Sequence, residues 1–319
     1  MDTNLAARLW QQLWHGLRDE HTPVPQIVWQ GHDAFCSVYP VSELAAASIA
    51  LAAQAAAALT GNPAKPRLDA HLASRWFQHS FRPINRPLPP AWDAFAGDYQ
   101  TADGWIRLHT NAPHHRQAME RVLGKQPDRA ALARIVAGWQ KQTLEQAIVD
   151  AGGCAAEMRS LEAWRQHPQG QSVAQEPLIA WQSQAESAPP AWALPIARPL
   201  HGVRVLDLTR VIAGPVATRF LAGLGAEVLR LDPPDWEEPT LEEEMMLGKR
   251  CARLDLKSDA GRQQFERLLM QTDVLVHGYR ADALEALGYD SARLQQLAPG
   301  LIDVSLNAWG WSGPWRNRR

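Results

Sequence analysis

Two patterns of apolar residues divide this sequence near residue 195. Before that point, apolar residues recur mostly at the three- and four-residue spacing of amphipathic helices. After it, short runs rich in Val, Leu and Ile alternate with segments of helical period. Such alternation is typical of a doubly wound parallel sheet with helices on both faces. The sequence therefore predicts an α/β fold, with a mainly helical domain over residues 1–195 and a parallel-sheet domain over residues 196–319.

The second domain contains five predicted strands, VRVLDL (203–208), EVLRLD (227–232), CARLDL (251–256), DVLVHGY (273–279) and LIDVSLN (301–307). Helices are expected between them, over residues 215–224, 259–271, 281–287 and 291–297. The preceding stretch, Ser187 to Pro199, contains four prolines and no hydrophobic period, which predicts an extended linker. Doubly wound sheets bind ligands beyond the carboxyl ends of their strands, so we expect a ligand site in this domain.

The first domain is predicted to contain an alanine-rich helix, a small hairpin and several further helices. The alanine-rich helix opens at Ser42 or Glu43 and ends at Gly61-Asn62-Pro63. Its apolar run is shorter than the roughly 20 residues needed to cross a bilayer, so a buried helix is expected. The segment DYQTADGWIRLHTN alternates around Asp103-Gly104, which predicts a β-hairpin. A helix should follow from Asn111 or Pro113 and stop at Gly124, with two more over residues 130–139 and 143–151.

Composition narrows the function classes. The formal net charge of −2 over 319 residues gives no field that would attract nucleic acid or an anionic membrane. Three cysteines lie far apart, which suits a reducing compartment, and no Cys or His spacing indicates a metal site. The N-terminus lacks the pattern of a signal peptide. We therefore expect a cytoplasmic protein with no metal, nucleic-acid or membrane partner.

The turn after the first predicted strand, TRVIAGP (209–215), offers chemistry for an anion. Gly214 permits a tight turn or a close ligand, and Pro215 suits the first helical position, where its missing N–H would have no helical partner. The free amides and partial positive charge of that helix start would face a ligand above the sheet. The glycine pattern of dinucleotide turns is absent, although Asp232 stands where such sites place an acidic residue. On this local basis a ligand-binding turn and a purely structural one remain equally open.

Basic residues in the loops of the second domain are candidate phosphate donors, although each alone is also typical of a solvated surface charge. They are Lys249, Arg250, Lys257, Arg316, Arg318 and Arg319.

Three motifs in one order then carry a family resemblance. The first motif is PLHGVRVLDLTRVIAGPVATRFLAGLGAEVLRLDPP. The second is LGKRCARLDLKSDAGRQQFERLLMQTDVLVHGYRADALEALGYD, and the third is PGLIDVSLNAWGWSGPW. Together they strongly resemble class III CoA-transferases, the CaiB/BaiF family. The resemblance implies a Rossmann-like domain, an acyl-CoA and a carboxylic acid as substrates, and an interlocked homodimer. It implies CoA contacts at Val211, Ile212, Ala213, Leu254, Lys257, Tyr279 and Arg319.

The first domain resembles a different part of the same family. The hairpin segment and AGGCAAEMRSLEAWRQHPQGQSV are similar to the family's small domain, which ordinarily follows the sheet rather than precedes it. The order is that of a long, permuted member. The resemblance also implies an aspartate nucleophile downstream of the GWSGPW loop, so we expect the sequence as given to stop before it, as a C-terminally truncated domain.

The upstream counterpart of the nucleophile falls at or next to Glu43, although a glutamate at a helix start is more typical of a capping or dipole-stabilising residue. His109, His114 and His115 are expected to be structural or surface residues. The predicted function is transfer of CoA between an acyl-CoA and a carboxylate. The alternatives are a non-catalytic CoA-binding protein or remnant, and an acyl-CoA racemase of the same family.

Overall fold

The computed structural model describes residues 1–18, 21–31, 35–62, 65–77, 82–183, 186–188 and 190–318. The chain separates into two compact units, neither of them continuous in sequence. Unit 1 comprises Met1–Pro87, Pro177–Tyr279 and Ala283–Leu306, and unit 2 comprises Leu88–Glu176, Arg280–Asp282 and Asn307–Arg319. The predicted boundary near residue 195 describes a change of sequence pattern, whereas the packing assigns segments from both sides of it to each unit. As a boundary between domains it stays a prediction.

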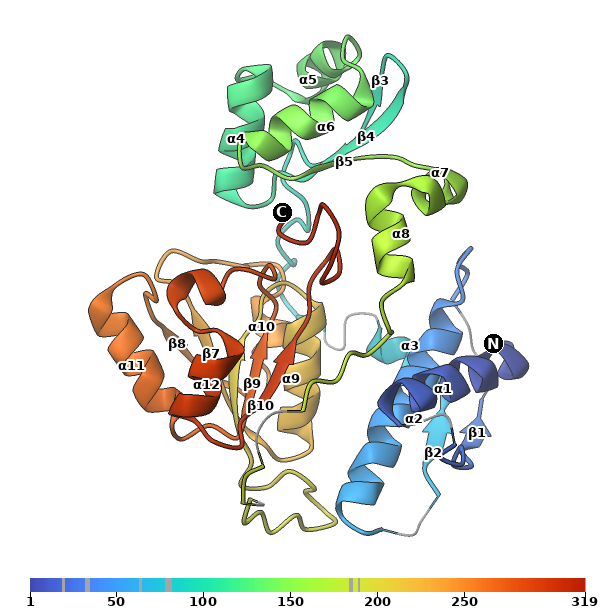
Figure 1. Cartoon of the computed structure of the whole chain (residues 1–319). Helices are drawn as coiled ribbons and strands as arrows, with labels where there is room; N and C mark the ends of the chain where they lie inside the picture. Colours follow the sequence, from blue (N-terminus) through green and yellow to red (C-terminus); the bar gives the residue numbers. More distant parts are fainter. Residues whose placement is uncertain are drawn as a thin grey trace. The chain divides into compact units, whose positions relative to one another are not determined.

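Unit 1 contains the predicted parallel sheet. Its strands are β6 (Arg204–Leu208), β7 (Glu227–Asp232), β8 (Arg250–Arg253), β9 (Val274–His277) and β10 (Ile302–Ser305). All pair in parallel in the order β10-β9-β6-β7-β8 (Figure 1). The first strand therefore lies in the middle: the chain runs from β6 to β7 and β8 on one side of it and then crosses back to β9 and β10 on the other. This order creates a switch point between β6 and β9, the place where such sheets bind ligands.

Apolar side chains that alternate along the strands pack into a separate buried cluster on each face of the sheet. Leucines such as Leu206 and Leu208 lie in one buried cluster with residues of α11 (Asp259–Leu269) and α12 (Ser291–Leu297). Valines such as Val205 lie in another cluster beside α9 (Ala213–Gly223). Successive side chains of a strand point to opposite faces, so each strand serves both layers. The α/β class predicted from the sequence is confirmed.

The helix predicted over residues 281–287 is wrong in extent. Only a single 3-10 turn, η1 (Glu285–Leu287), forms there. Gly288 follows it at once in the left-handed conformation, with φ 88°. The first turn of a helix is the costly one to form, and the left-handed Gly288 ends this segment before further turns can repay that cost. A short helix that the sequence did not predict, α10 (Glu242–Met245), precedes β8.

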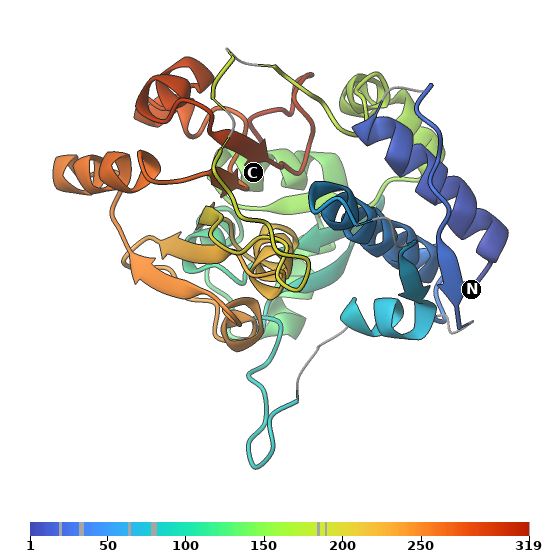
Figure 2. The same cartoon turned by 90° about the horizontal axis from the view of Figure 1, so that it is seen from below.

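The amino-terminal part of unit 1 is helical with one small parallel strand pair. It contains α1 (Thr3–Leu17), α2 (Val41–Leu59), α3 (Ala70–Trp76), β1 (Val28–Gln30) and β2 (Arg67–Asp69). Trp10 and Trp14 of α1 pack on Ala46, Ala50 and Leu51 of the predicted alanine-rich helix, and both views show α1 beside α2 (Figures 1 and 2). By length and composition alone α2 could cross a membrane, and 39% of its apolar window is buried within the protein. The core helix of a globular protein also meets these criteria of length and composition. Along the side that faces Trp10 and Trp14, α2 packs as a core helix does.

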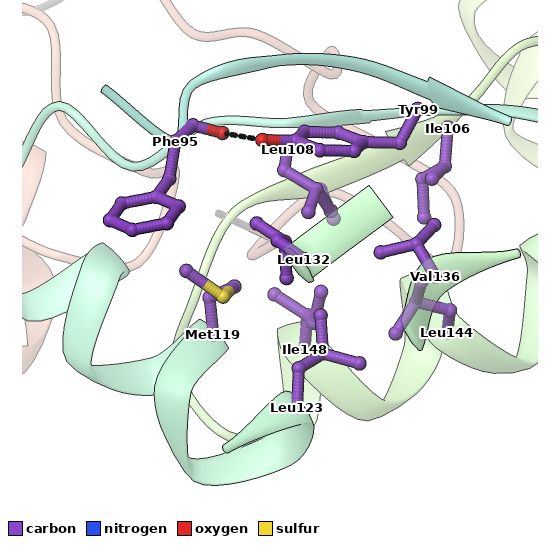
Figure 3. Close-up of a cluster of buried hydrophobic side chains, with 11 residues drawn as sticks. Phe95, Tyr99, Ile106, Leu108, Met119, Leu123, Leu132, Val136, Leu144 and Ile148 are labelled. Atoms are coloured by element: carbon purple, nitrogen blue, oxygen red, sulfur yellow. Dashed lines mark hydrogen bonds between the residues drawn. The ribbon is translucent and has the colours of Figure 1, made fainter. Parts of the chain in front are cut away.

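Unit 2 is built on the predicted hairpin. Strands β3 (Gly97–Thr101) and β4 (Gly104–Leu108) pair antiparallel around Ala102-Asp103, and β5 (Ala155–Glu157) adds a third strand to β4. Figure 3 shows the core beneath them, where the Tyr99 hydroxyl donates to the Phe95 carbonyl over 2.7 Å. The helices are α4 (Pro113–Leu123), α5 (Arg129–Val136), α6 (Lys141–Asp150), α7 (Leu161–Gln166) and α8 (Pro168–Ala174). Pro113 starts α4 and Gly124 ends it, as predicted.

The tryptophan-rich loop of residues 307–318 also belongs to unit 2. The Gln169 side chain is fully buried, donates to the carbonyls of Trp309 and Ser312, and accepts from the Trp315 amide. Glu176 accepts from the amide and hydroxyl of Ser312 and from the Trp311 amide. Two side chains of the HPQGQSVAQE segment thus hold this loop in place.

Candidate ligand site at the carboxyl edge of the sheet

The candidate site begins where β6 and β9 end side by side. Leu208 pairs with His277 in the last register of these strands, so the turn of residues 209–212 and the dipeptide Gly278-Tyr279 emerge together. The Arg210 guanidinium joins them, with its carbon 5.4 Å from the Tyr279 ring centroid and 4.5 Å from the Trp236 ring centroid. The structure therefore brings the predicted residues Val211, Ile212 and Tyr279 to the switch point of the sheet.

The turn itself has an unusual backbone. Val211 has φ 66°, in the left-handed region that β-branched residues avoid. Such a conformation costs roughly 1–3 kcal/mol and persists where its surroundings impose it. The side chains of Val211 and its neighbour Ile212 are 50% and 52% exposed. The turn presents two apolar side chains to solvent beside the start of α9.

Gly214 serves packing rather than an approaching ligand. A Cβ at this position would lie 2.3 Å from the Cβ of Thr209, and Gly214 is buried. The close contact joins the beginning of the turn to the first turn of α9. Pro215 is buried in that same first turn, and no side chain caps the helix. The uncapped start of this 11-residue helix is the feature that suits an anion.

Beneath the turn, Asp207 forms the centre of a buried polar network. Its carboxylate accepts from the amide and hydroxyl of Thr209, from the Thr218 hydroxyl, and from Lys249 Nζ at 2.9 Å. The side chains of Asp207 and Lys249 are both fully buried. Burial lowers the pKa of Lys249, and the neighbouring carboxylate only partly opposes this. Lys249, a candidate phosphate donor or solvated surface charge in the sequence, instead forms a buried ion pair with Asp207 below the turn.

A second buried group of charges lies on the next strand. Arg230 Nε and Nη2 donate to both oxygens of Asp232, at 2.8 and 3.1 Å. Arg230 Nη2 also donates to Glu238 Oε2 at 2.6 Å. Burial disfavours the guanidinium charge, but these hydrogen bonds outweigh it and raise the Arg230 pKa. Asp232 stands where dinucleotide-binding sites place an acidic residue. Its carboxylate is already paired with Arg230.

Glu238 connects this charge group to the turn. Its Oε1 accepts the Val211 amide at 2.6 Å, while its Oε2 accepts Arg230. The sequence pattern did not indicate Glu238, Arg210 or Trp236 as site residues. Glu238 lies in the segment DPPDWEEPTLEEE, where a run of acidic residues is typical of a solvated loop. The only local signal was the tryptophan within that run.

Leu254 and Lys257 follow β8, two strands away from β6 along the same carboxyl edge. Adjacent strands are about 4.8 Å apart, so these residues begin roughly 10 Å from the turn. Leu254 packs partly into the leucine cluster, and Lys257 is exposed. Tyr279 is partly buried, and this burial raises the pKa of its hydroxyl despite the nearby Arg210 charge. As CoA contacts, all three stay predictions.

The remaining predicted site residues lie elsewhere. Glu43 is 9% exposed in the first turn of α2, where its Oε1 accepts the Asp2 amide at 2.7 Å. Within unit 2, Arg318 pairs with Glu145 at 3.3 Å and is 7% exposed, whereas Arg316 is exposed. Arg319 falls outside the described residues.

The three candidate histidines, His109, His114 and His115, lie in unit 2. His109 packs against Trp92, and burial together with the charge of Arg107 lowers its pKa. Neighbouring His114 and His115 have ring centroids 4.2 Å apart. Over the part of the chain that the structure describes, no three His, Cys, Asp or Glu side chains gather in a metal-binding arrangement.

Comparison with known proteins assigns a family to the part of the chain that forms this site. Residues 200–319 match the family model described as CoA-transferase family III. An acyl-CoA transferase of Gibberella moniliformis is 30% identical over 267 residues, covering 74% of this chain and 47% of the relative. The acetyl-coenzyme A transferase nodX of Hypoxylon pulicicidum is 41% identical over 128 residues, covering 38% and 21%. A succinate–glutarate CoA-transferase of Agrobacterium fabrum is 34% identical over 136 residues, covering 37% and 34%.

The chain spans less than half the length of each of these relatives. The similarity to the Gibberella protein extends beyond residues 200–319 into the preceding region.

Proposed function

We propose that the turn from Val211 to Gly214 binds coenzyme A or an acyl-CoA, on the premise that residues 200–319 match the family model described as CoA-transferase family III. The observation that carries the proposal is the position of the turn. It stands at the switch point between β6 and β9, with Tyr279 beside it and two exposed apolar side chains above it. Open α/β sheets bind their ligands at this place.

The chemistry of the site suits the mixed character of CoA. Val211 and Ile212 offer an apolar surface to the adenine or pantetheine portion. The uncapped start of α9 and the exposed Lys257 on the same edge would favour the phosphates. The Val211 amide already donates to Glu238, so the backbone contribution would come from the amides that follow it.

The family supports a reaction in which CoA passes from an acyl-CoA to a carboxylic acid. We further propose that the 319 residues by themselves transfer CoA poorly, because the counterpart of the family's nucleophilic aspartate in them falls at or next to Glu43. Glu43 is a poor substitute, since its carboxylate is nearly buried and already accepts the Asp2 amide. CoA binding without turnover is therefore the activity expected of this chain.

Calorimetric titration with CoA tests the binding site. Ile212→Asp should raise the dissociation constant at least about tenfold, because it removes an apolar contact and places a charge near the phosphates. Ile196→Asp is the matched control, since Ile196 is 65% exposed in the same unit and lies outside the turn. Equal affinity of the wild-type chain and the Ile212 variant would show that CoA binds elsewhere.

A transfer assay tests the second proposal. Acyl-CoA and a dicarboxylic acid are incubated with the chain, and the new thioester is followed by chromatography. Turnover should not exceed the uncatalysed rate. Substantial turnover that survives Glu43→Gln would show a nucleophile that neither the resemblance nor the site analysis identified, whereas turnover abolished by that substitution would assign the role to Glu43.

A further inference from the structure

The backbone of the Val211 turn is hydrogen-bonded to a side chain from a distant loop. Val211 adopts a left-handed backbone that a β-branched residue does not choose by itself. The Val211 amide donates to the Glu238 carboxylate, 27 positions further along the chain. The strain and the hydrogen bond occur at the same residue.

Glu238 is well placed to impose this geometry. Its side chain is 7% exposed and divides its two oxygens between the Val211 amide and the Arg230 guanidinium, both at 2.6 Å. Arg230 is itself fixed by two hydrogen bonds to Asp232, and its side chain is 1% exposed. The carboxylate therefore has little freedom, and a charged acceptor gives a stronger hydrogen bond than a neutral one.

We infer that Glu238 is a positioning residue that locks Val211 in the left-handed conformation and so keeps the apolar side chains of the turn pointing out as a ligand platform. Without the lock, Val211 should relax toward negative φ, the amide should lose its acceptor, and the two apolar side chains should no longer be held in place. The inference rests on the proposed CoA site for its functional consequence, but its structural half can be tested without ligand.

The experiment is a double-mutant cycle of Glu238→Ala with Val211→Gly, because glycine adopts positive φ without strain and should not need the lock. Glu237→Ala is the control, since it removes an exposed neighbouring carboxylate of the same loop. The first measurement is hydrogen exchange of the residue 211 amide in the ligand-free chain. Glu238→Ala should accelerate this exchange at least about tenfold, as expected for loss of a hydrogen bond to a charged acceptor. Glu237→Ala should leave it unchanged.

The second measurement is the dissociation constant for CoA. Glu238→Ala should weaken binding about tenfold when residue 211 is Val and less than about threefold when it is Gly, because the glycine turn no longer depends on the lock. Equal weakening in both backgrounds would overturn the inference, since it would show that Glu238 acts through stability or charge alone.

Two further results separate the possible failures. If the wild-type chain does not bind CoA but Glu238→Ala still accelerates exchange at Val211, the proposed CoA site is wrong. The role of Glu238 in fixing the Val211 backbone is then still supported. If exchange at Val211 is unchanged, the lock is wrong whatever binds. Should the Ala variant not fold, Glu238→Gln replaces it in the same cycle. Its neutral acceptor predicts a smaller effect of the same sign and the same dependence on residue 211, and an equal effect in both backgrounds would again overturn the lock.

Discussion

Lys249 carries a buried ammonium group in unit 1. In the sequence it stands in a basic pair before a strand, a position that favours a phosphate donor or a solvated charge. In the folded protein its ammonium group is fully buried and donates to Asp207, to the Thr218 hydroxyl and to the Pro215 carbonyl. It thereby supports the first turn of α9 from inside the unit.

Lys249→Met should destabilise the protein by about 3–5 kcal/mol, because it leaves the Asp207 carboxylate buried without a cation. Chemical denaturation measures this loss. Arg250→Met should cost less than about 1 kcal/mol, since its side chain is 76% exposed. The double variant Asp207→Asn/Lys249→Met should lose less than the sum of its single substitutions. Strict additivity would show that the pair is not coupled.

At the scale of elements, strands with long apolar runs followed the sequence pattern closely. β6, β7 and β9 formed within the predicted segments because their Val and Leu residues alternate between two buried faces. The short pair β1 and β2 was not predicted, since three residues are too few to establish a period.

The docking of the tryptophan-rich loop on α8 should depend on pH through Glu176. Burial opposes its ionisation, but the hydrogen bonds from Ser312 and Trp311 outweigh that effect and lower the Glu176 pKa. A lowered carboxyl pKa stabilises the folded state above the ordinary value, and this contribution is lost as the pH falls through the lowered one. Protection of the Trp311 and Ser312 amides from hydrogen exchange should therefore decline in that acidic range.

Glu176→Gln provides the matched control for the loop. The amide oxygen can still accept hydrogen bonds but does not titrate, so protection should be weaker at neutral pH and flat across the same range. A pH-dependent decline that persists in this variant would assign the effect to another group of unit 2.

At the scale of the whole molecule, the two units should respond differently to the proposed ligand. CoA at a concentration of 100 times its dissociation constant should stabilise the unit that binds it by about 2.7 kcal/mol. Hydrogen exchange should show this protection in the sheet of unit 1, while the Phe95–Tyr99 core of unit 2 stays unchanged. Equal protection of both units would show that they unfold as one. An interlocked homodimer and a cytoplasmic location stay predictions.

The α/β class, most strands and helices, and the family resemblance of residues 200–319 follow from the amino-acid sequence alone, because these depend on local periodicity and on contiguous motifs. Which charges remain available for a ligand was fixed by tertiary packing. Lys249 and Asp232 were candidates for a ligand until packing paired them with Asp207 and Arg230. Glu238 could not be predicted, because its contact with Val211 spans 27 positions and depends on how one loop folds over the sheet. The sequence specifies the type of each residue and its neighbours along the chain. The group that pairs with a buried charge depends on the tertiary fold.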